Sequence, residues 1–288
     1  MKRLLFFLLA ALSLSLPSPG RERPDDLREE VEFFADSLRA GRGLGTPGAQ
    51  GVIFYLVRQL RDAGMETTVQ GFREDGKVGH NVVAVTPGSF QQYIVVSAYL
   101  DGLGVLDGTL YPGADANASG LAALLALARE LPERARGVTG LVFVAFDGHN
   151  TNLSGSRAWL ERFRRQYPIS LMVNLDILGS SLAPVRKEDP DYLIALGADD
   201  YWFNLVSFSS RYDIGVSFDY YGSDAFTKVF YRQVSDQRWF LEAGIPAVMF
   251  TSGITMNTNK AADTPDTLDY GLLDRRIQLI SRWLRTLF

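Results

Sequence analysis

Long apolar runs that alternate with helical segments are the feature of this sequence that most constrains its fold. The runs at 93–98 (YIVVSA), 140–146 (GLVFVAF) and 170–177 (SLMVNLDI) are apolar on both faces of an extended chain, as in strands buried between two layers of helices. Residues 118–131, between the first two runs, have the pattern of a helix that packs on a sheet. The alternation predicts an α/β fold, a single-domain three-layer αβα sandwich with a mixed, mostly parallel central sheet.

The same patterns predict the remaining elements. A helix is expected to begin near Pro24, with Leu27, Val31, Phe34 and Leu38 on one face, and a second helix is expected to end at Gly64. Further strands are expected at 65–72, 81–87, 192–196 and 244–251, and further helices at 154–167, 199–212 and 265–287. The charged segment 184–192 is expected to form a surface loop.

Composition excludes several classes of protein. The chain has 288 residues, of which 47% are hydrophobic and 22% are charged, which suits one globular domain with a full core. Its net charge is -4 and no basic patch is evident, so no nucleic-acid partner is expected. Because the chain has no cysteine, disulfides and thiolate metal sites are excluded.

The N-terminus has the pattern of a secretory signal peptide. Lys2 and Arg3 precede an apolar run from Leu4 to Leu16, and small residues follow. The run is short for a membrane span, so we predict a signal peptide over residues 1–20 and a mature domain over 21–288 without a transmembrane segment. The mature protein is then expected to be periplasmic or extracellular. An uncleaved membrane anchor is the alternative.

Polar side chains gather where the expected strands end. Tyr99 and Asp101 follow one buried run, and Asp115 lies in the small-residue turn YPGADANASG before the next helix. Further polar residues follow the other runs: Asp147, His149, Asn150, Asp176, Asn257 and Asn259. Ligands of open α/β sheets bind beyond the carboxyl ends of the strands. These residues therefore mark a candidate site.

The sequences of six segments, and their order along the chain, resemble those of a known family. The segments are VVSAYLDGLG, YPGADANASGLAALLALAR, LVFVAFDGHNTNLSGSRAW, LMVNLDILG, SDQRWFLEAGIPAVMF and NKAADTPDTLDY. Together they resemble the di-zinc aminopeptidase family of metallopeptidase clan MH, which also contains carboxypeptidases and glutaminyl cyclases. The resemblance covers essentially the whole of residues 21–288 and implies a zinc exopeptidase fold.

The resemblance also implies a site in which two zinc ions share a carboxylate and a Glu acts as general base. Carried over position by position, the family's roles fall on seven residues of this chain: Tyr99 (first His ligand), Asp101 (the Asp that orients it), Asp115 (bridging Asp), His149 (general base), Asn150 (Glu ligand), Asp176 (Asp ligand) and Asn259 (last His ligand). Three of five ligands and the base are therefore replaced, and only Asp115 and Asp176 are retained.

These replacements predict a divergent member that is catalytically inactive, a pseudoenzyme. No metal or other cofactor is expected, and zinc would be required only if the family activity were retained. We expect hydrogen-bond donors on Tyr99, His149, Asn150 and Asn259 to surround Asp115 and Asp176 in place of metal ions. The former active-site cleft is then expected to bind a peptide or a small molecule.

Other interpretations of the site remain open. Asp115, Asp176 and His149 could form an atypical single-metal hydrolase site, and the two carboxylates could instead hold calcium or magnesium. The protein could also act as a scaffold for a cell-envelope partner, without use of a pocket. His80, at the start of an expected strand, is assigned a surface or edge role.

An aromatic segment, residues 216–233, is expected near the mouth of the cleft if the resemblance holds. Tyr220, Tyr221, Phe226 and Tyr231 could line a pocket there, or they could serve ordinary packing. In the turn at Asp115, Asn117 or Ser119 is expected to cap the following helix.

Overall fold

The computed structural model describes residues 24–132, 137–188 and 190–288. The expected signal peptide lies outside the described residues. Within the described ranges, no helix is both long enough and apolar enough to cross a membrane.

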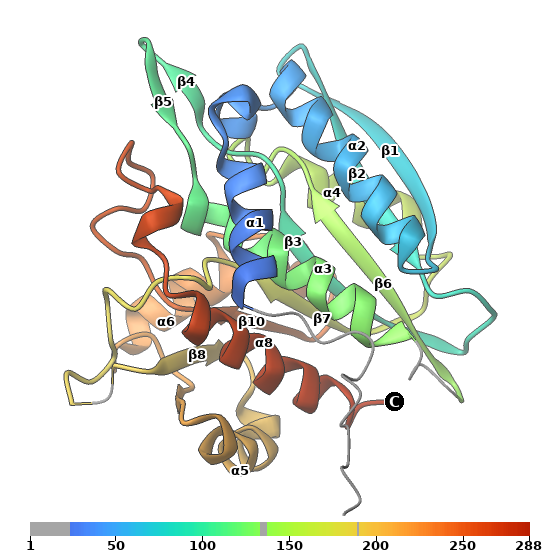
Figure 1. Cartoon of the computed structure of the whole chain (residues 1–288). Helices are drawn as coiled ribbons and strands as arrows, with labels where there is room; N and C mark the ends of the chain where they lie inside the picture. The colour runs from blue at the N-terminus through green and yellow to red at the C-terminus, as the bar shows by residue number, and fades with distance from the viewer. Residues whose placement is uncertain (1–23, 133–136, 189) are drawn as a thin grey trace, which may run out of the picture.

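An eight-stranded sheet forms the centre of the molecule (Figure 1). Its strands, in spatial order, are β1 (Glu66–Glu74), β2 (Lys77–Val85), β6 (Thr139–Phe146), β3 (Gln92–Tyr99), β7 (Ile169–Leu175), β10 (Ala247–Thr251), β8 (Tyr192–Leu196) and β9 (Gly215–Ser217). The four middle strands run parallel, whereas β1, β2 and β8 join by antiparallel pairings. The mixed, mostly parallel α/β sheet predicted from the sequence is confirmed.

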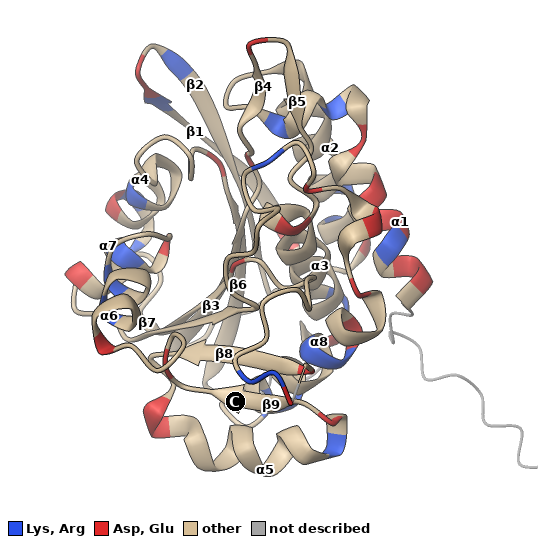
Figure 2. Cartoon of the chain, turned by 90° about the vertical axis from the view of Figure 1, so that its left-hand side faces the viewer, with Lys and Arg blue, Asp and Glu red and all other residues tan. Residues whose placement is uncertain are grey.

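Helices cover both faces of this sheet (Figure 2). One face carries α1 (Pro24–Ala35), α2 (Pro47–Asp62), α3 (Gly120–Glu130) and α8 (Tyr270–Leu284), and the other carries α4 (Ser154–Phe163), α6 (Asp224–Arg232) and α7 (Gln237–Glu242). The helix α5 (Trp202–Tyr212) packs beside β9 and α8 at one edge. Two buried hydrophobic clusters fill the two interfaces between helices and sheet.

The register of the middle strands explains why they read as apolar runs. Val95 of β3 pairs with Val142 of β6 on one side and with Met172 of β7 on the other. All three side chains are fully buried in the cluster beneath α4 and α7. Alternate residues of the same strands, such as Val96, enter the opposite cluster.

Several elements differ from the sequence prediction. The first helix ends at Ala35, and Leu38 lies in a 3-10 helix (Ser37–Arg42) with 79% of its surface exposed. The Asp36 carboxylate accepts a hydrogen bond from the Leu38 amide and so starts this new turn. The small hairpin of β4 (Gly104–Leu106) and β5 (Thr109–Tyr111), the strand β9, and the helices α6 and α7 were not predicted.

Candidate ligand-binding cleft

A cavity of about 220 Å³ opens at the carboxyl ends of β3, β7 and β10. Five of the seven candidate site residues line it: Tyr99, His149, Asn150, Asp176 and Asn259. The rest of the wall is mostly apolar or aromatic, formed by Ile177, Tyr220, Phe230, Val234, Met249, Thr251, Ile254 and Thr258. Asp101 and Asp115 are buried and do not line this cavity.

Tyr99 and His149 form a stacked pair on the floor of the cavity. Their ring centroids lie 3.7 Å apart with an angle of 11° between the planes. Tyr99 is the last residue of β3 and is almost fully buried. Burial, together with the charges of Asp176 and Asp101, raises the pKa of Tyr99 well above its usual value. The phenol is therefore neutral and offers an O–H donor.

A buried carboxylate fixes the orientation of the His149 ring. His149 Nδ1 lies 2.9 Å from Oδ2 of Asp236, whose side chain is fully buried. Burial lowers the pKa of His149, but attraction to Asp236, Asp176 and Asp101 outweighs that effect and raises it to about 9. At neutral pH the ring is an imidazolium, with its Nδ1 proton held by Asp236.

Asp101 holds the turn that carries His149 and Asn150. Its carboxylate accepts hydrogen bonds from the amides of His149 (2.8 Å) and Asn150 (3.1 Å) and from the side-chain nitrogen of Asn150 (3.2 Å). The side-chain Nδ2 of Asn150 therefore donates to Asp101 and not to Asp115 or Asp176. These bonds fasten the turn after β6 to the segment after β3.

Asp176 is held by a polar network that crosses the sheet. Ser235 Oγ donates to Asp176 Oδ2 at 2.5 Å, and Ser235 Oγ in turn accepts from Asn174 Nδ2 at 2.8 Å. Asn174 also accepts from Ser97 Oγ at 3.0 Å. Burial raises the pKa of Asp176, and attraction to His149 lowers it. Ser235 and Asp236 are thus site residues that the sequence reasoning did not assign a role, although their segment SDQRW was one of the six recognised.

The carboxylate of Asp115 is held by a separate set of hydrogen bonds. Its Oδ1 accepts from the Gly179 amide at 2.7 Å and from Ser119 Oγ at 3.1 Å. Its Oδ2 is buried and has no hydrogen-bond partner among the described residues. The carboxylate of Asp263 accepts from the amides of Asp115 (2.7 Å) and Ala116 (3.0 Å). Burial, followed by repulsion from Asp263, raises the pKa of Asp115 to about 7.

The donors expected around the two carboxylates are therefore not the ones found. Ser235 serves Asp176, while Gly179 and Ser119 serve Asp115. The helix-capping expectation is also wrong, because neither Ser119 nor Asn117 caps α3. Asn117 instead bonds the backbone on either side of Asp176, donating to the Leu175 carbonyl and accepting from the Ile177 amide.

The aromatic segment reaches the cavity through Tyr220. The Tyr220 hydroxyl accepts from the Ile254 amide at 2.9 Å, and its ring stacks on Phe230 at 4.0 Å. Phe226 is 61% exposed, and Tyr231 donates to the carbonyl of Ala247. His80 lies in β2, where its Nδ1 is 3.1 Å from Gln50 Nε2, away from the cavity.

The acidic and imidazole groups are sparse for a metal centre. Across residues 24–132, 137–188 and 190–288, no group of three or more His, Cys, Asp or Glu side chains is placed to hold a metal ion. Asp176 already accepts a hydrogen bond from Ser235, and Oδ2 of Asp115 has no hydrogen-bond partner among the described residues. Asn150 and Asn259 offer neutral amides, which are poor zinc ligands.

Relatives of this chain are found among both sequences and solved structures. The alkaline phosphatase isozyme conversion protein of Escherichia coli K12 is 28% identical over 194 residues, which is 58% of this chain and 54% of that protein. The chain spans about half the length of the curated relatives it matches.

Two solved structures share its fold. BSAP, a zinc aminopeptidase from Bacillus subtilis, superimposes with a TM-score of 0.73 at 12% identity, over 92% of this chain and 95% of that one. The glutaminyl cyclase of Porphyromonas gingivalis gives 0.72 at 18% identity, over 93% and 100%. At such identities the likeness shows the fold alone, which is the zinc aminopeptidase architecture predicted from the sequence.

The family follows from the sequence match. The profile described as Peptidase family M28 matches residues 81–284, which include every residue that lines the cavity. This chain belongs to peptidase family M28.

Proposed function

We propose that this protein is an exported, catalytically inactive member of family M28 whose cleft binds a peptide or small ligand without zinc. The observation that supports this most is the chemistry of the cavity floor. It carries a phenol, an imidazolium and two amides at Tyr99, His149, Asn150 and Asn259, and one carboxylate at Asp176. Export rests on the pattern of residues 1–20.

The residues present do not fit a pair of zinc ions. A zinc pair requires several anionic or imidazole donors with free lone pairs, but the cavity lining offers one carboxylate, Asp176, and one imidazole, His149, whose pKa of about 9 favours the protonated ring. His149 also cannot act as the general base of hydrolysis while it carries that proton. The protein's own groups therefore serve to bind and orient a ligand.

The shape of the cavity indicates the kind of ligand. Its volume of about 220 Å³ is below the usual range for drug-sized ligands, so it suits one side chain or a small molecule. Phe230, Val234 and Ile254 add apolar surface to the lining. A ligand with an apolar group and a polar head satisfies both this surface and the polar lining.

One observation favours a second candidate, a single-metal hydrolase. Asp115 Oδ2 is buried without a partner among the described residues, as an oxygen that awaits a cation would be. Asp115, Asp176 and His149 would form its site. The pKa of Asp115 is raised to about 7, so protonation of the carboxyl group explains the unpartnered oxygen equally well. We therefore favour the inactive protein.

Aminopeptidase assays with and without added zinc, together with a fragment and peptide binding screen, test this proposal. We expect no hydrolysis beyond that of the variant Asp176→Asn, and fragment binding that Tyr99→Ala abolishes. Asp62→Asn, at an exposed position on α2, is the matched surface control. Zinc-dependent hydrolysis that Asp176→Asn removes would establish the hydrolase instead. If every hit survives Tyr99→Ala, or if there are no hits at all, the cleft is not a binding site.

A further inference from the structure

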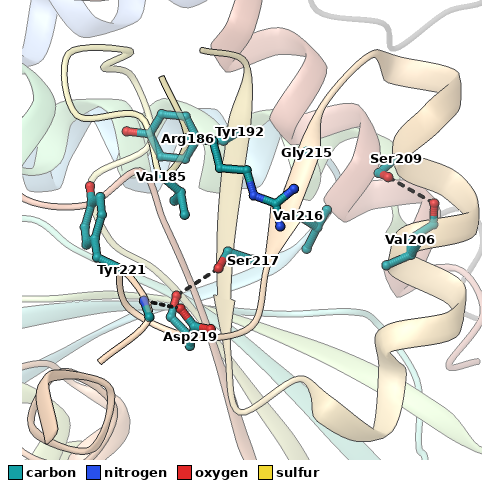
Figure 3. Close-up of a pocket in the computed structure, with 11 residues that line it drawn as sticks. Val185, Arg186, Tyr192, Val206, Ser209, Gly215, Val216, Ser217, Asp219 and Tyr221 are labelled. Atoms are coloured by element: carbon teal, nitrogen blue, oxygen red, sulfur yellow. Dashed lines mark hydrogen bonds between the residues drawn. The ribbon is translucent and has the colours of Figure 1, made fainter. Parts of the chain in front are cut away.

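A second and larger pocket lies at the β9 edge of the sheet (Figure 3). Its volume is about 510 Å³, within the range of small-molecule sites. It is bounded by β9, by Val206 and Ser209 of α5, by the segment that carries Arg186, and by the turn that carries Asp219. It shares no lining residue with the cleft.

Two opposite charges lie in this pocket without pairing to each other. Arg186 extends its guanidinium toward the middle of the lining residues (Figure 3). Neither an ion pair nor a side-chain hydrogen bond links Arg186 to any part of the chain that the structure describes. Asp219 is the only carboxylate in the lining, and its Oδ1 accepts from the Gly222 amide at 2.6 Å. Its backbone carbonyl accepts from Ser217 Oγ, which fixes the turn.

Aliphatic and aromatic side chains make up much of the remaining lining, together with Ser209 and Ser217. Val185, Val206 and Val216 contribute aliphatic walls, and Tyr192 and Tyr221 contribute rings. Both tyrosine hydroxyls are already engaged, Tyr192 with the Ser252 carbonyl and Tyr221 with the Ala183 carbonyl at 2.6 Å. Tyr221 is 38% exposed and offers its ring to a ligand, whereas Tyr192 is almost fully buried behind the lining. The charged groups left for polar recognition are Arg186 and Asp219.

We propose that this pocket binds a short apolar peptide with both termini free, a dipeptide or tripeptide. Its carboxylate would pair with Arg186, since guanidinium and carboxylate match as a two-bond fork. Its ammonium group would pair with Asp219, and its side chains would lie against the valines and tyrosines.

Other ligand classes fit these groups less well. A phosphate or another dianion would meet one cation and would be repelled by Asp219. A wholly apolar ligand would cover Arg186 and Asp219 and leave both charges without a partner, which is costly. A ligand with one charge of each sign and an apolar middle avoids both penalties.

Isothermal titration calorimetry with the dipeptide Leu-Leu tests the proposal. Arg186→Gln and Asp219→Asn should each weaken binding by about tenfold or more, because each removes a charge-assisted hydrogen bond. Lys187→Gln, which changes the neighbouring exposed cation outside the pocket, should leave affinity unchanged. N-acetyl-Leu-Leu and Leu-Leu-amide, each without one terminal charge, should bind weakly to the wild-type protein.

The cleft variant Asp176→Asn separates the two sites. If it leaves Leu-Leu affinity intact while Arg186→Gln removes it, the peptide sits in the β9 pocket. The proposal is overturned if Leu-Leu does not bind, if capping either terminus has no effect, or if Arg186→Gln and Lys187→Gln behave alike. It is also overturned if Asp176→Asn abolishes binding. Because the altered side chains at 186 and 219 are exposed, circular dichroism should show an unchanged fold.

Discussion

In the cleft, the charge of one imidazole is compensated by nearby carboxylates of the same chain. The His149 imidazolium lies between Asp236, which bonds to Nδ1, and the charges of Asp176 and Asp101. The ring of Tyr99, the last residue of β3, stacks on this imidazole. With its raised pKa, the ring supplies positive charge beside the carboxylates of Asp236, Asp176 and Asp101.

Asp236→Asn should lower the pKa of His149 from about 9 toward or below the ordinary value for histidine. The substitution removes the nearest carboxylate, after which burial, which favours the neutral ring, has more weight. An NMR titration of the imidazole protons measures this directly. The chain has only two histidines, so His80→Gln assigns the signals. An unchanged titration midpoint would mean that Asp236 does not set the charge of His149.

Asp115→Asn should become more stable relative to the wild-type protein as the pH rises. The pKa of Asp115 is raised from 3.8 to about 7 in the folded state. The folded state therefore holds a proton that the unfolded state loses, and this contribution to stability is full below about pH 4 and is lost as the pH rises through about 7. Urea unfolding at about pH 4 and pH 8 should show a relative gain of about 3 kcal/mol.

Asp62→Asn provides the matched control for that measurement. Asp62 lies on the surface of α2, and its contact with Arg58 is a long i,i+4 pair. The control should show less than about 0.5 kcal/mol of change between the two pH values. If Asp115→Asn loses stability as the pH rises, the buried carboxylate is charged in the folded protein and the proposed protonation is wrong.

At the scale of elements, Arg42 ties three segments together around the site. The guanidinium is fully buried and donates to the carbonyls of Leu100, Phe34, Pro112 and Gly113 at 2.7 to 3.0 Å. These carbonyls belong to the segment after β3, to α1 and to the loop before Asp115. One side chain from the 3-10 helix thus positions the segment after β3 that carries Asp101 and the loop that carries Asp115.

Arg42→Met should destabilise the fold by about 3 kcal/mol or more, because it leaves four buried carbonyls without their donor. Arg58→Gln, at a position where 76% of the side chain is exposed, should cost less than about 0.5 kcal/mol. Chemical denaturation of both variants gives the comparison. Equal stability of the two would show that the Arg42 bonds do not hold these segments.

The elements that the sequence predicted are those with a strong burial pattern. The strands β3, β6 and β7 read as apolar runs because both of their faces are covered, and α3 because nearly all of it is buried. The helix α6 has no buried residue, and β9 has only three residues. The strand β9 is too short to give a periodic signal. The helix α6 does carry Phe226, Val229 and Phe230 at helical spacing, a short pattern that the sequence prediction did not use.

The site was predictable to the extent that its residues follow strands. Tyr99, His149, Asn150 and Asp176 lie directly after buried strands and meet in one cavity. The partners of these groups come from elsewhere: Ser235 and Asp236 precede α7, a short helix without a clear apolar stripe. Their contacts depend on how α7 packs against β7 and β10, which local sequence does not encode.

At the scale of the whole molecule, one sheet carries two pockets of different chemistry. The cleft lies at the carboxyl ends of the middle strands, and the larger pocket lies at the β9 edge. Tyr220 of the cleft and Tyr221 of the edge pocket are neighbours whose rings meet edge to face at 4.8 Å. The two pockets therefore meet at this pair of tyrosine rings. The fold that carries them is one that this chain has in common with zinc aminopeptidases.

We propose that this M28 protein folds and binds its ligand without zinc. Elemental analysis of protein purified natively, without chelators, tests it most directly. We expect zinc far below one ion per chain, with an unchanged melting temperature after dialysis against a chelator. Zinc that approaches one or two ions per chain, and that Asp115→Ala or Asp176→Ala removes, would contradict it.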